Sequence, residues 1–187
     1  HGEDARLLAD PQEWPLVRTA QGEFAVEGAD HVEEVDSGVL FHRLPEAALS
    51  RIPMEFFRVV EAQPTGVRFR METRATAIEL VVSTTVGVFF TDEPVEWFGQ
   101  VDVLVDGELH SQVPVRTGAV RTMNVLTNDS TVNSADPVSV RFDGLPDRDK
   151  IVEIWLPHGV EVAVRSLEAN APISPSRDTR PIWLHYG

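Results

Sequence analysis

The 187-residue chain is long enough to bury one well-packed core, and its 42% hydrophobic and 25% charged residues are ordinary for a globular protein. Its 16 basic residues against 30 acidic residues give a formal net charge of −14, which disfavours nucleic acid and anionic membranes as partners. Because the chain has no cysteine, disulfides, thiolate zinc sites and a cysteine nucleophile are excluded.

The sequence contains no targeting or membrane segment that its composition would reveal. No apolar run approaches the roughly 20 residues of a membrane-spanning helix, and no secretory signal peptide is visible. A chain that begins with His1 and Gly2 rather than methionine is expected to have been trimmed. Nothing in the composition demands an oxidising compartment, and we expect a cytoplasmic location, no cofactor and no metal.

The first 44 residues are predicted to contain only short extended pieces. Residues 1–22 form an acidic and mixed N-terminal segment whose one apolar anchor is residues 14–17. Three extended pieces are expected after it, at Glu23–Val26, His31–Val35 and Val39–Leu44.

A helical insert is predicted at about residues 46–62. Pro45 and Pro53 both suit the first turn of a helix, because proline fixes a helical φ and lacks the N–H that would go unpaired there. Phe56, Val59 and Val60 have i, i+3, i+4 spacing. This pattern indicates two short helices, the second with one buried face.

From Val67 onward the hydrophobic pattern has a period of two. Residues 67–72 alternate apolar with charged side chains, as in a strand with one solvated face. Asp106-Gly107 between two apolar runs is a two-residue hairpin signal. Further strands are expected at Ala77–Val82, Val86–Phe90, Val101–Val105, Glu108–His110, Val113–Val115, Val120–Leu126, Val138–Phe142, Ile151–Leu156 and Val160–Leu167.

These short strands recur at a spacing of roughly 8–12 residues, which favours a two-sheet sandwich. No convincing helix interrupts residues 67–167, so a doubly wound parallel sheet is excluded there. The sequence therefore predicts an all-β fold, an antiparallel, jelly-roll-like β-sandwich over residues 23–167 with one or two short helices.

The end of the sequence is predicted to be the start of a second domain. Residues 168–181 are rich in proline, serine, asparagine and aspartate, as a linker is. Arg180–Gly187 is an apolar run that follows a proline and ends in glycine, which indicates a buried strand entering a tight turn. Residues 182–187 would then be the first strand of an α/β domain.

That run resembles the first strand of the SGNH hydrolases, or GDSL-type esterases, in the branch with an extra N-terminal β domain. Three other stretches resemble the same branch in the same order. They are Arg43–Pro45 with Arg51–Pro53, Gly66–Thr73, and Phe142–Pro146 followed by Val152–Pro157. Together the resemblance covers about residue 40 to Gly187.

The resemblance implies a sandwich packed against a C-terminal SGNH catalytic domain of the same protein, which cleaves esters through a Ser–His–Asp arrangement. The family's catalytic serine immediately follows the glycine that matches Gly187, so Gly187 would lead into the oxyanion loop. No catalytic residue can be placed within the 187 residues, and we expect the stretch alone to be inactive. The substrate would be a small ester or acylated sugar, and the sandwich would help to shape the cleft.

Several stretches superficially suggest chemistry and are given plainer interpretations. Asn128-Asp129-Ser130 mimics a serine elbow, but no helix follows it to support an oxyanion, so we expect a polar β-turn. The six histidines are scattered without metal-ligand spacing. Asp143, Asp147 and Asp149 lack the regular alternation of a calcium loop, which favours a solvated loop.

Aromatic residues supply the candidate binding positions. Trp97 is expected in a loop and Trp155 on a strand, where Trp155 would contact the catalytic domain. His185 is expected on the strand just before the catalytic loop, either as a hydrogen-bonded strand histidine or as a substrate contact. Exposed tryptophans on a sandwich also stack on sugar rings, so an independent carbohydrate-binding module is the main alternative, and a dimerisation domain is a third.

Overall fold

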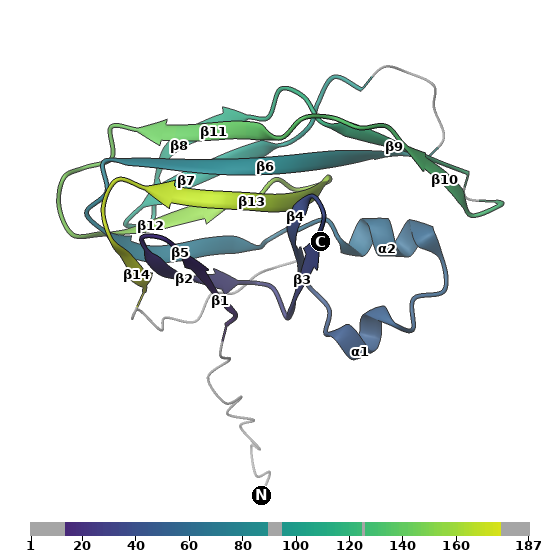
Figure 1. The fold of residues 1–187 in the computed structure, drawn as a ribbon, viewed down its shortest axis with the longest axis horizontal. Coiled ribbons are helices and arrows are strands. Elements are labelled where there is room, and N and C mark those ends of the chain that lie inside the picture. Colours follow the sequence, from purple (N-terminus) through teal and green to yellow (C-terminus); the bar gives the residue numbers. More distant parts are fainter. Residues whose placement is uncertain (1–13, 90–94, 125, 177–187) are drawn as a thin grey trace, which may run out of the picture.

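The computed structural model describes residues 14–89, 95–124 and 126–176, which form two packed seven-stranded sheets (Figure 1). In order across the first sheet, the strands are β1 (Leu16–Thr19), β2 (Gly22–Glu27), β14 (Ile173–Pro175), β5 (Arg68–Thr73), β12 (Lys150–Trp155), β7 (Gln100–Val105) and β8 (Glu108–Pro114). The second sheet runs β10 (Asp129–Val132), β9 (Ala119–Asn124), β6 (Ala77–Val88), β13 (Glu161–Ala169), β4 (Gly38–His42) and β3 (His31–Val35), and β11 (Val138–Asp143) also pairs with β6.

The predicted fold class is confirmed, with two exceptions to strictly antiparallel pairing. Strand β9 runs parallel to β6, and β14 meets β2 in a parallel pairing, so both sheets are mixed. The helical insert is also confirmed as α1 (Glu46–Leu49) and α2 (Glu55–Glu61), which lie beside one end of the sandwich in Figure 1. Of the described residues, no helix has the length and apolar character needed to cross a membrane.

The core lies between the two sheets and is built from the inward-facing residues, which alternate along the strands of both sheets. Phe69 on β5 lies near its centre, with its ring centroid 4.7 Å from that of Phe24 on β2 and 5.2 Å from that of Phe41 on β4. Because Phe41 belongs to the second sheet, these rings join the two layers. Burying such aromatic surface is a large favourable term in folding.

The Asp106-Gly107 hairpin signal is confirmed. Asp106 has φ 51° and Gly107 has φ 85°, the two left-handed conformations that a tight two-residue turn requires. The Asp106 carboxylate also accepts a hydrogen bond of 2.9 Å from the backbone N–H of Ile151. This bond, together with the backbone bond from Asp106 N to Ile151 O, fixes the turn against β12.

The structure extends the sandwich beyond the predicted sequence limits at both ends. Strand β1 lies within the predicted N-terminal segment, where it pairs with β2. Strand β13 runs to Ala169 and β14 pairs with β5, so the described part of the predicted linker contributes to both sheets. The rest of that linker and the strand predicted at residues 182–187 lie outside the described residues.

Candidate functional site

The outer face of the first sheet carries charged side chains that are buried. On β5, Phe69 and Met71 point into the core, and the alternation sends Arg68 and Arg70 to the opposite face. The sequence pattern predicted a solvated face there, and this prediction was wrong: Arg68 is 5% exposed and Arg70 is 4% exposed. Buried guanidinium groups need paired charges, because removing an ion from water is costly.

Two glutamates from neighbouring strands supply those charges. Arg68 donates to Glu27 on β2 and, at 2.8 Å, to Glu153 on β12. Arg70 donates to Glu27 at 3.4 Å, and its Nε lies 3.7 Å from a Glu153 carboxylate oxygen. We refer to Glu27, Arg68, Arg70 and Glu153 as the Arg–Glu layer. With two charges of each sign, the layer is formally neutral.

Trp155 lies beside this layer at the end of β12. Its indole Nε1 donates to Glu153 at 3.3 Å, and the Arg68 guanidinium carbon lies 4.8 Å from the ring centroid, in the geometry of a cation–π contact. Val152 and Ile154, its neighbours in the alternation, are fully buried in the core. Trp155 is therefore a partly exposed aromatic residue that polar contacts hold in place on the outer face.

Trp97 is the more exposed of the two candidate tryptophans, at 44%. It lies in the segment before β7, where its ring centroid is 5.6 Å from that of His158 in the turn between β12 and β13. The structure records no ring contact between Trp97 and Trp155 among the described residues, so the two do not form a single aromatic platform. His185 and Gly187 lie outside the described residues.

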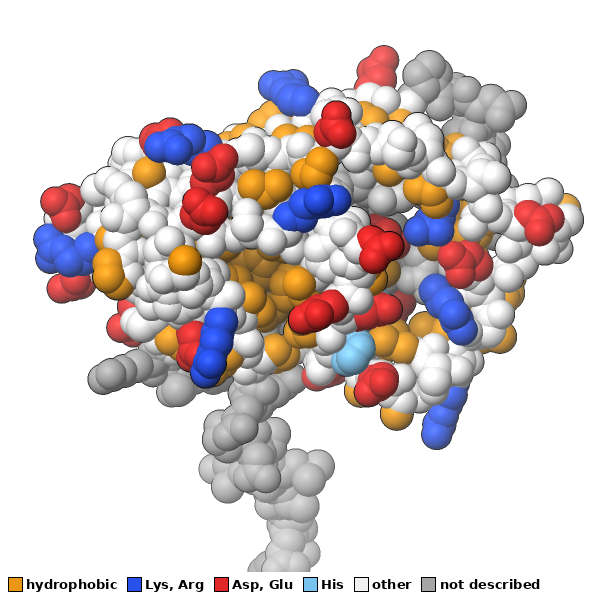
Figure 2. All heavy atoms as spheres, in the orientation of Figure 1, with side chains coloured by type: hydrophobic (Ala, Val, Ile, Leu, Met, Phe, Trp, Pro, Cys, Tyr) orange, Lys and Arg blue, Asp and Glu red, His pale blue; other side chains and the backbone are white. Residues whose placement is uncertain are grey.

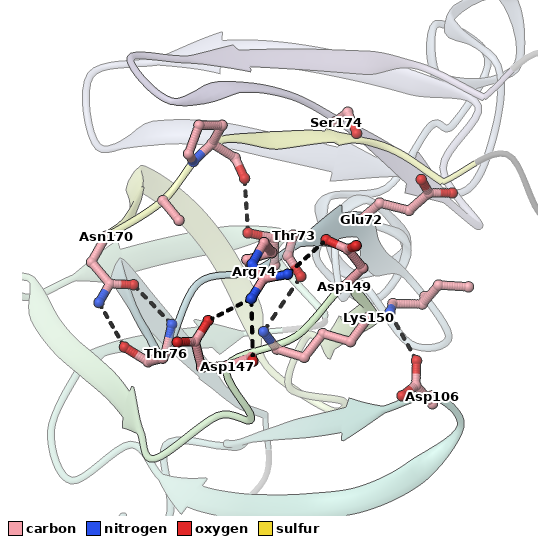
Figure 3. Close-up of a pocket in the computed structure, with 13 residues that line it drawn as sticks. Glu72, Thr73, Arg74, Thr76, Asp106, Asp147, Asp149, Lys150, Asn170 and Ser174 are labelled. Carbon is pink, nitrogen blue, oxygen red and sulfur yellow. Dashed lines mark hydrogen bonds and ion pairs between the residues drawn. The ribbon is translucent and has the colours of Figure 1, made fainter.

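A pocket of about 850 Å³ lies where the ends of β5, β12 and β14 meet (Figure 3). Its most deeply buried charge is Lys150, the only lysine of the chain. The ammonium nitrogen donates to three backbone carbonyls, at 2.6 Å to Ala75, 3.4 Å to Thr73 and 3.5 Å to Arg148. Burial lowers the pKa of Lys150, and the positive charge of Arg148 adds to this effect. The lysine thus fills a carbonyl cage that would otherwise attract a cation.

The aspartates near this pocket are engaged with arginines. Arg74 lies 3.2 Å from Asp147 and 3.7 Å from Asp149, and Figure 3 shows its guanidinium between the two carboxylates. Asp143, at the end of β11 and outside the lining of this pocket, accepts from Arg141 at 3.0 Å. In the described ranges, no three histidine, cysteine, aspartate or glutamate side chains come together in a way that could hold a metal ion.

A second polar pocket of about 510 Å³ lies between the helical insert and the second sheet. At its centre is His42, whose Nδ1 is 2.7 Å from Glu61 on α2 and whose Nε2 is 2.9 Å from Glu33 on β3. Sequence reasoning missed this group, because it treated the histidines as scattered. Strand pairing and helix packing bring the three residues together, and their spacing in the sequence does not indicate that they meet.

The His42 imidazole and the Glu61 carboxylate stabilise each other as a charged pair. Burial alone would lower the pKa of His42, but the hydrogen bond and negative charge of Glu61, reinforced by Glu33, raise it above its ordinary value. Burial alone would raise the pKa of Glu61, but the bonds from His42 and from the backbone N–H groups of Leu44 and Arg43 lower it. The His42–Glu61 pair therefore holds α2 against β4.

The Asn128-Asp129-Ser130 stretch has no serine-elbow geometry. Asn128 occupies a turn with φ 62°, and Asp129 and Ser130 already belong to β10, which pairs with β9. A strand, not a helix, therefore follows the serine. Ser130 itself lies opposite Met123 of β9 in this ladder.

Among known proteins, the similarity to this chain is found in solved structures. No protein-family model matches the sequence, and no curated protein is recognisably similar. The salicylyl-acyltransferase SsfX3 from a tetracycline biosynthetic pathway superposes with a TM-score of 0.72 at 25% identity. A structure assigned as a GDSL-like lipase from Bacteroides ovatus is more distant, with a TM-score of 0.44 at 14% identity over 87% of this chain and 42% of that chain.

The similarity to the acyltransferase covers very different shares of the two chains. It covers 94% of this chain but only 45% of the acyltransferase chain, so this chain spans less than half the length of that protein. The chain is thus a two-sheet β-sandwich with the fold and extent of one part of an acyltransferase structure, as an accessory domain would have.

Proposed function

We propose that this chain is the non-catalytic N-terminal β-sandwich of an SGNH/GDSL-type serine esterase. The intact protein would hydrolyse an acyl ester or carry out a related acyl transfer, with a small ester or acylated sugar as substrate. The single observation that carries the proposal is the structural match of 94% of the chain to 45% of an acyltransferase. The resemblance of Arg180–Gly187 to the first strand of that family supports it independently.

The described residues are consistent with an accessory role. Three groups of buried polar side chains are bound to one another or to the backbone: the Arg–Glu layer, the Lys150 cage and the His42–Glu61 pair. A nucleophile with a base within hydrogen-bond distance, which ester cleavage by serine requires, is not found among them. The chemistry would therefore come from a partner domain.

The outer face of the first sheet is the surface that we assign to that partner domain. Tryptophan and arginine are the residue types most enriched at the energetic centres of protein interfaces. Trp155 is held by Glu153 and Arg68, so it would present a rigid aromatic surface with little further loss of side-chain entropy on contact. The sandwich would in this way support one wall of the cleft.

The test compares the 187-residue stretch with a longer product of the same gene that continues past Gly187. We expect the longer form to hydrolyse p-nitrophenyl acyl esters and the stretch alone to be inactive. Replacing the serine predicted to follow Gly187 by alanine should abolish the activity. Hydrolysis by the stretch alone, or activity that survives the serine replacement, would contradict the proposal.

A matched pair of variants tests the assigned surface. Trp155→Ala in the longer form should lower both the thermal stability and kcat/KM, because the contact to the catalytic domain is weakened. Val132→Ala, an exposed residue on β10 of the second sheet, should leave both unchanged. If the two variants behave alike, the outer face of the first sheet is not the contact surface.

The alternative of an independent carbohydrate-binding module retains one supporting observation, the exposed ring of Trp97. It requires the isolated stretch to bind a glycan with an affinity that Trp97→Ala removes. A calorimetric titration against a glycan panel that releases no heat would eliminate it, and would leave the accessory-domain proposal untouched.

A further inference from the structure

A pocket of about 260 Å³ opens between the two sheets, where β1 and β2 lie opposite β4 and β13. Figure 2 shows hydrophobic side chains in a hollow between the positions of β13 and β1. The apolar lining comes from both sheets, and its larger side chains are those of Val17, Phe24, Val39, Phe41, Val164 and Leu167. It is thus an opening into the side of the core, distinct from the polar pockets described above.

The pairing of the second sheet explains why a pocket forms at the edge of the core there. Strand β4 pairs with β13 through the single pair Val39 and Val164. The register of β13 against β6 then shifts between Val164 and Ser166, as at a β-bulge. A bulge bends its strand and interrupts the ladder. The two strands therefore share little of the ladder beside Val39, which is only partly buried, while Phe41 beneath them stays 1% exposed.

One polar atom at this pocket has no partner. Gln21, in the turn between β1 and β2, lines the pocket, and its side-chain Oε1 is buried without a hydrogen bond. The backbone of Gln21 is fixed, because its N–H donates to Thr19 Oγ1 at 3.2 Å and its carbonyl accepts from Ile173 at 3.0 Å. A buried acceptor without a donor is unfavourable, and a ligand hydroxyl would satisfy it.

The charges around the opening cancel. Arg18 pairs with Glu23 on the neighbouring strand. Arg165 and Glu168, both on β13, contribute one charge of each sign to the lining. The rim therefore offers no net field that would favour an ionic ligand over a neutral one.

We propose that this pocket binds a small uncharged apolar molecule that carries one hydrogen-bond donor, of the class of a phenol or a short-chain alcohol. An apolar cavity of about 150 Å³ is enough to hold benzene, so 260 Å³ accommodates one aromatic ring with its hydroxyl. The ring lies among the Phe, Val and Leu side chains, and the hydroxyl donates to Gln21 Oε1. The proposal does not depend on the proposed function, because the pocket lies wholly within the described sandwich.

The test is a titration of the 187-residue chain with phenol, benzene and benzoate, followed by amide and methyl NMR. We expect phenol to shift the resonances of Val39, Val164 and Leu167 in a saturable way. Benzene, which lacks the donor, should bind roughly 10-fold more weakly, and benzoate more weakly still because its charge would be buried unpaired. Absence of saturable shifts with phenol, or equal binding of benzoate, would overturn the proposal.

Three variants distinguish binding in this pocket from nonspecific binding elsewhere on the protein. Val17→Trp, from the edge strand β1, fills the pocket and should abolish phenol binding. Leu16→Trp, on the same strand but 55% exposed, is the control and should bind as the parent does. Gln21→Met keeps the length of the side chain and removes the acceptor, so the preference for phenol over benzene should disappear. Retention of binding by Val17→Trp, or of the preference by Gln21→Met, would contradict the assignment.

Discussion

The ammonium nitrogen of Lys150 lies 2.6 Å from the carbonyl oxygen of Ala75, in the turn that connects β5 to β6. With the carbonyls of Thr73 and Arg148, this contact connects the start of β12 to the turn that leads into the second sheet. A single side chain thus satisfies three backbone acceptors at a place where the chain passes between layers.

Replacing Lys150 by methionine should therefore destabilise the fold, although methionine matches its shape and removes a buried charge. The carbonyls would lose their donor, and an unsatisfied buried acceptor costs about 1–3 kcal/mol. We expect a loss of about 2 kcal/mol in the free energy of unfolding, measured by urea denaturation. Arg148→Met, which removes an exposed ion pair with Asp106, is the control and should cost less than about 1 kcal/mol. Equal losses would mean that the cage is already hydrated.

The His42–Glu61 pair predicts a defined pH dependence of stability. The pKa of His42 is raised in the folded state, so its contribution is complete below about pH 6.5 and is lost as the pH rises through the folded-state pKa. The pKa of Glu61 is lowered, so its contribution is present above about pH 4.5 and is lost as the pH falls through its folded-state value. The pair therefore stabilises the protein most between these two limits.

His42→Gln tests this window. We expect it to reduce the free energy of unfolding by about 3 kcal/mol near pH 5.5, because Glu61 is left buried without its partner charge. The difference from the parent should shrink as the pH rises toward 9. His158→Gln, in an exposed turn, is the control and should leave the free energy of unfolding near pH 5.5 close to that of the parent. A His42→Gln penalty that is the same at both pH values would rule out the charged pair.

The sequence predicts the parts of this fold that local patterns determine. Period-two alternation located β5, β7 and β12, and Asp106-Gly107 located the hairpin. Strand β14 was missed, because its three residues follow Pro172, end in Pro175 and carry no pattern. They are held by pairing with β5 and β2. The burial of Arg68 was missed for a similar reason: alternation gives its face, but not the glutamates that two other strands bring to it.

Alanine substitutions at two glycines separate the stability cost of backbone strain from that of a steric clash. Gly107 has φ 85° and open space where a Cβ would lie, so Gly107→Ala should cost about 1–2 kcal/mol from conformation alone. Gly22 has φ 139°, and a Cβ there would lie 2.0 Å from the carbonyl oxygen of Ile173 on β14. Gly22→Ala should therefore cost clearly more, as measured by thermal and urea unfolding. If Gly22→Ala is the milder change, β14 does not pack against β2 as the structure describes.

The ion pairs of the Arg–Glu layer are buried. Replacing an arginine there should therefore cost more stability than replacing an arginine of an exposed ion pair on the same sheet. Arg68→Met leaves both Glu27 and Glu153 without a main partner in a buried setting, which should cost about 3–5 kcal/mol. Arg18→Met, whose side chain is 87% exposed and pairs with Glu23, should cost less than about 1 kcal/mol.

A compensated variant makes this comparison specific to charge. Adding Glu27→Gln and Glu153→Gln to Arg68→Met removes the stranded carboxylates and should recover a large part of the loss, because neutral amides are far cheaper to bury than unpaired ions. Recovery would identify a dehydrated, rigid layer beneath Trp155. If Arg68→Met proves as mild as Arg18→Met, water reaches the layer. Trp155 would then lack the rigid support that its proposed contact with a partner domain requires.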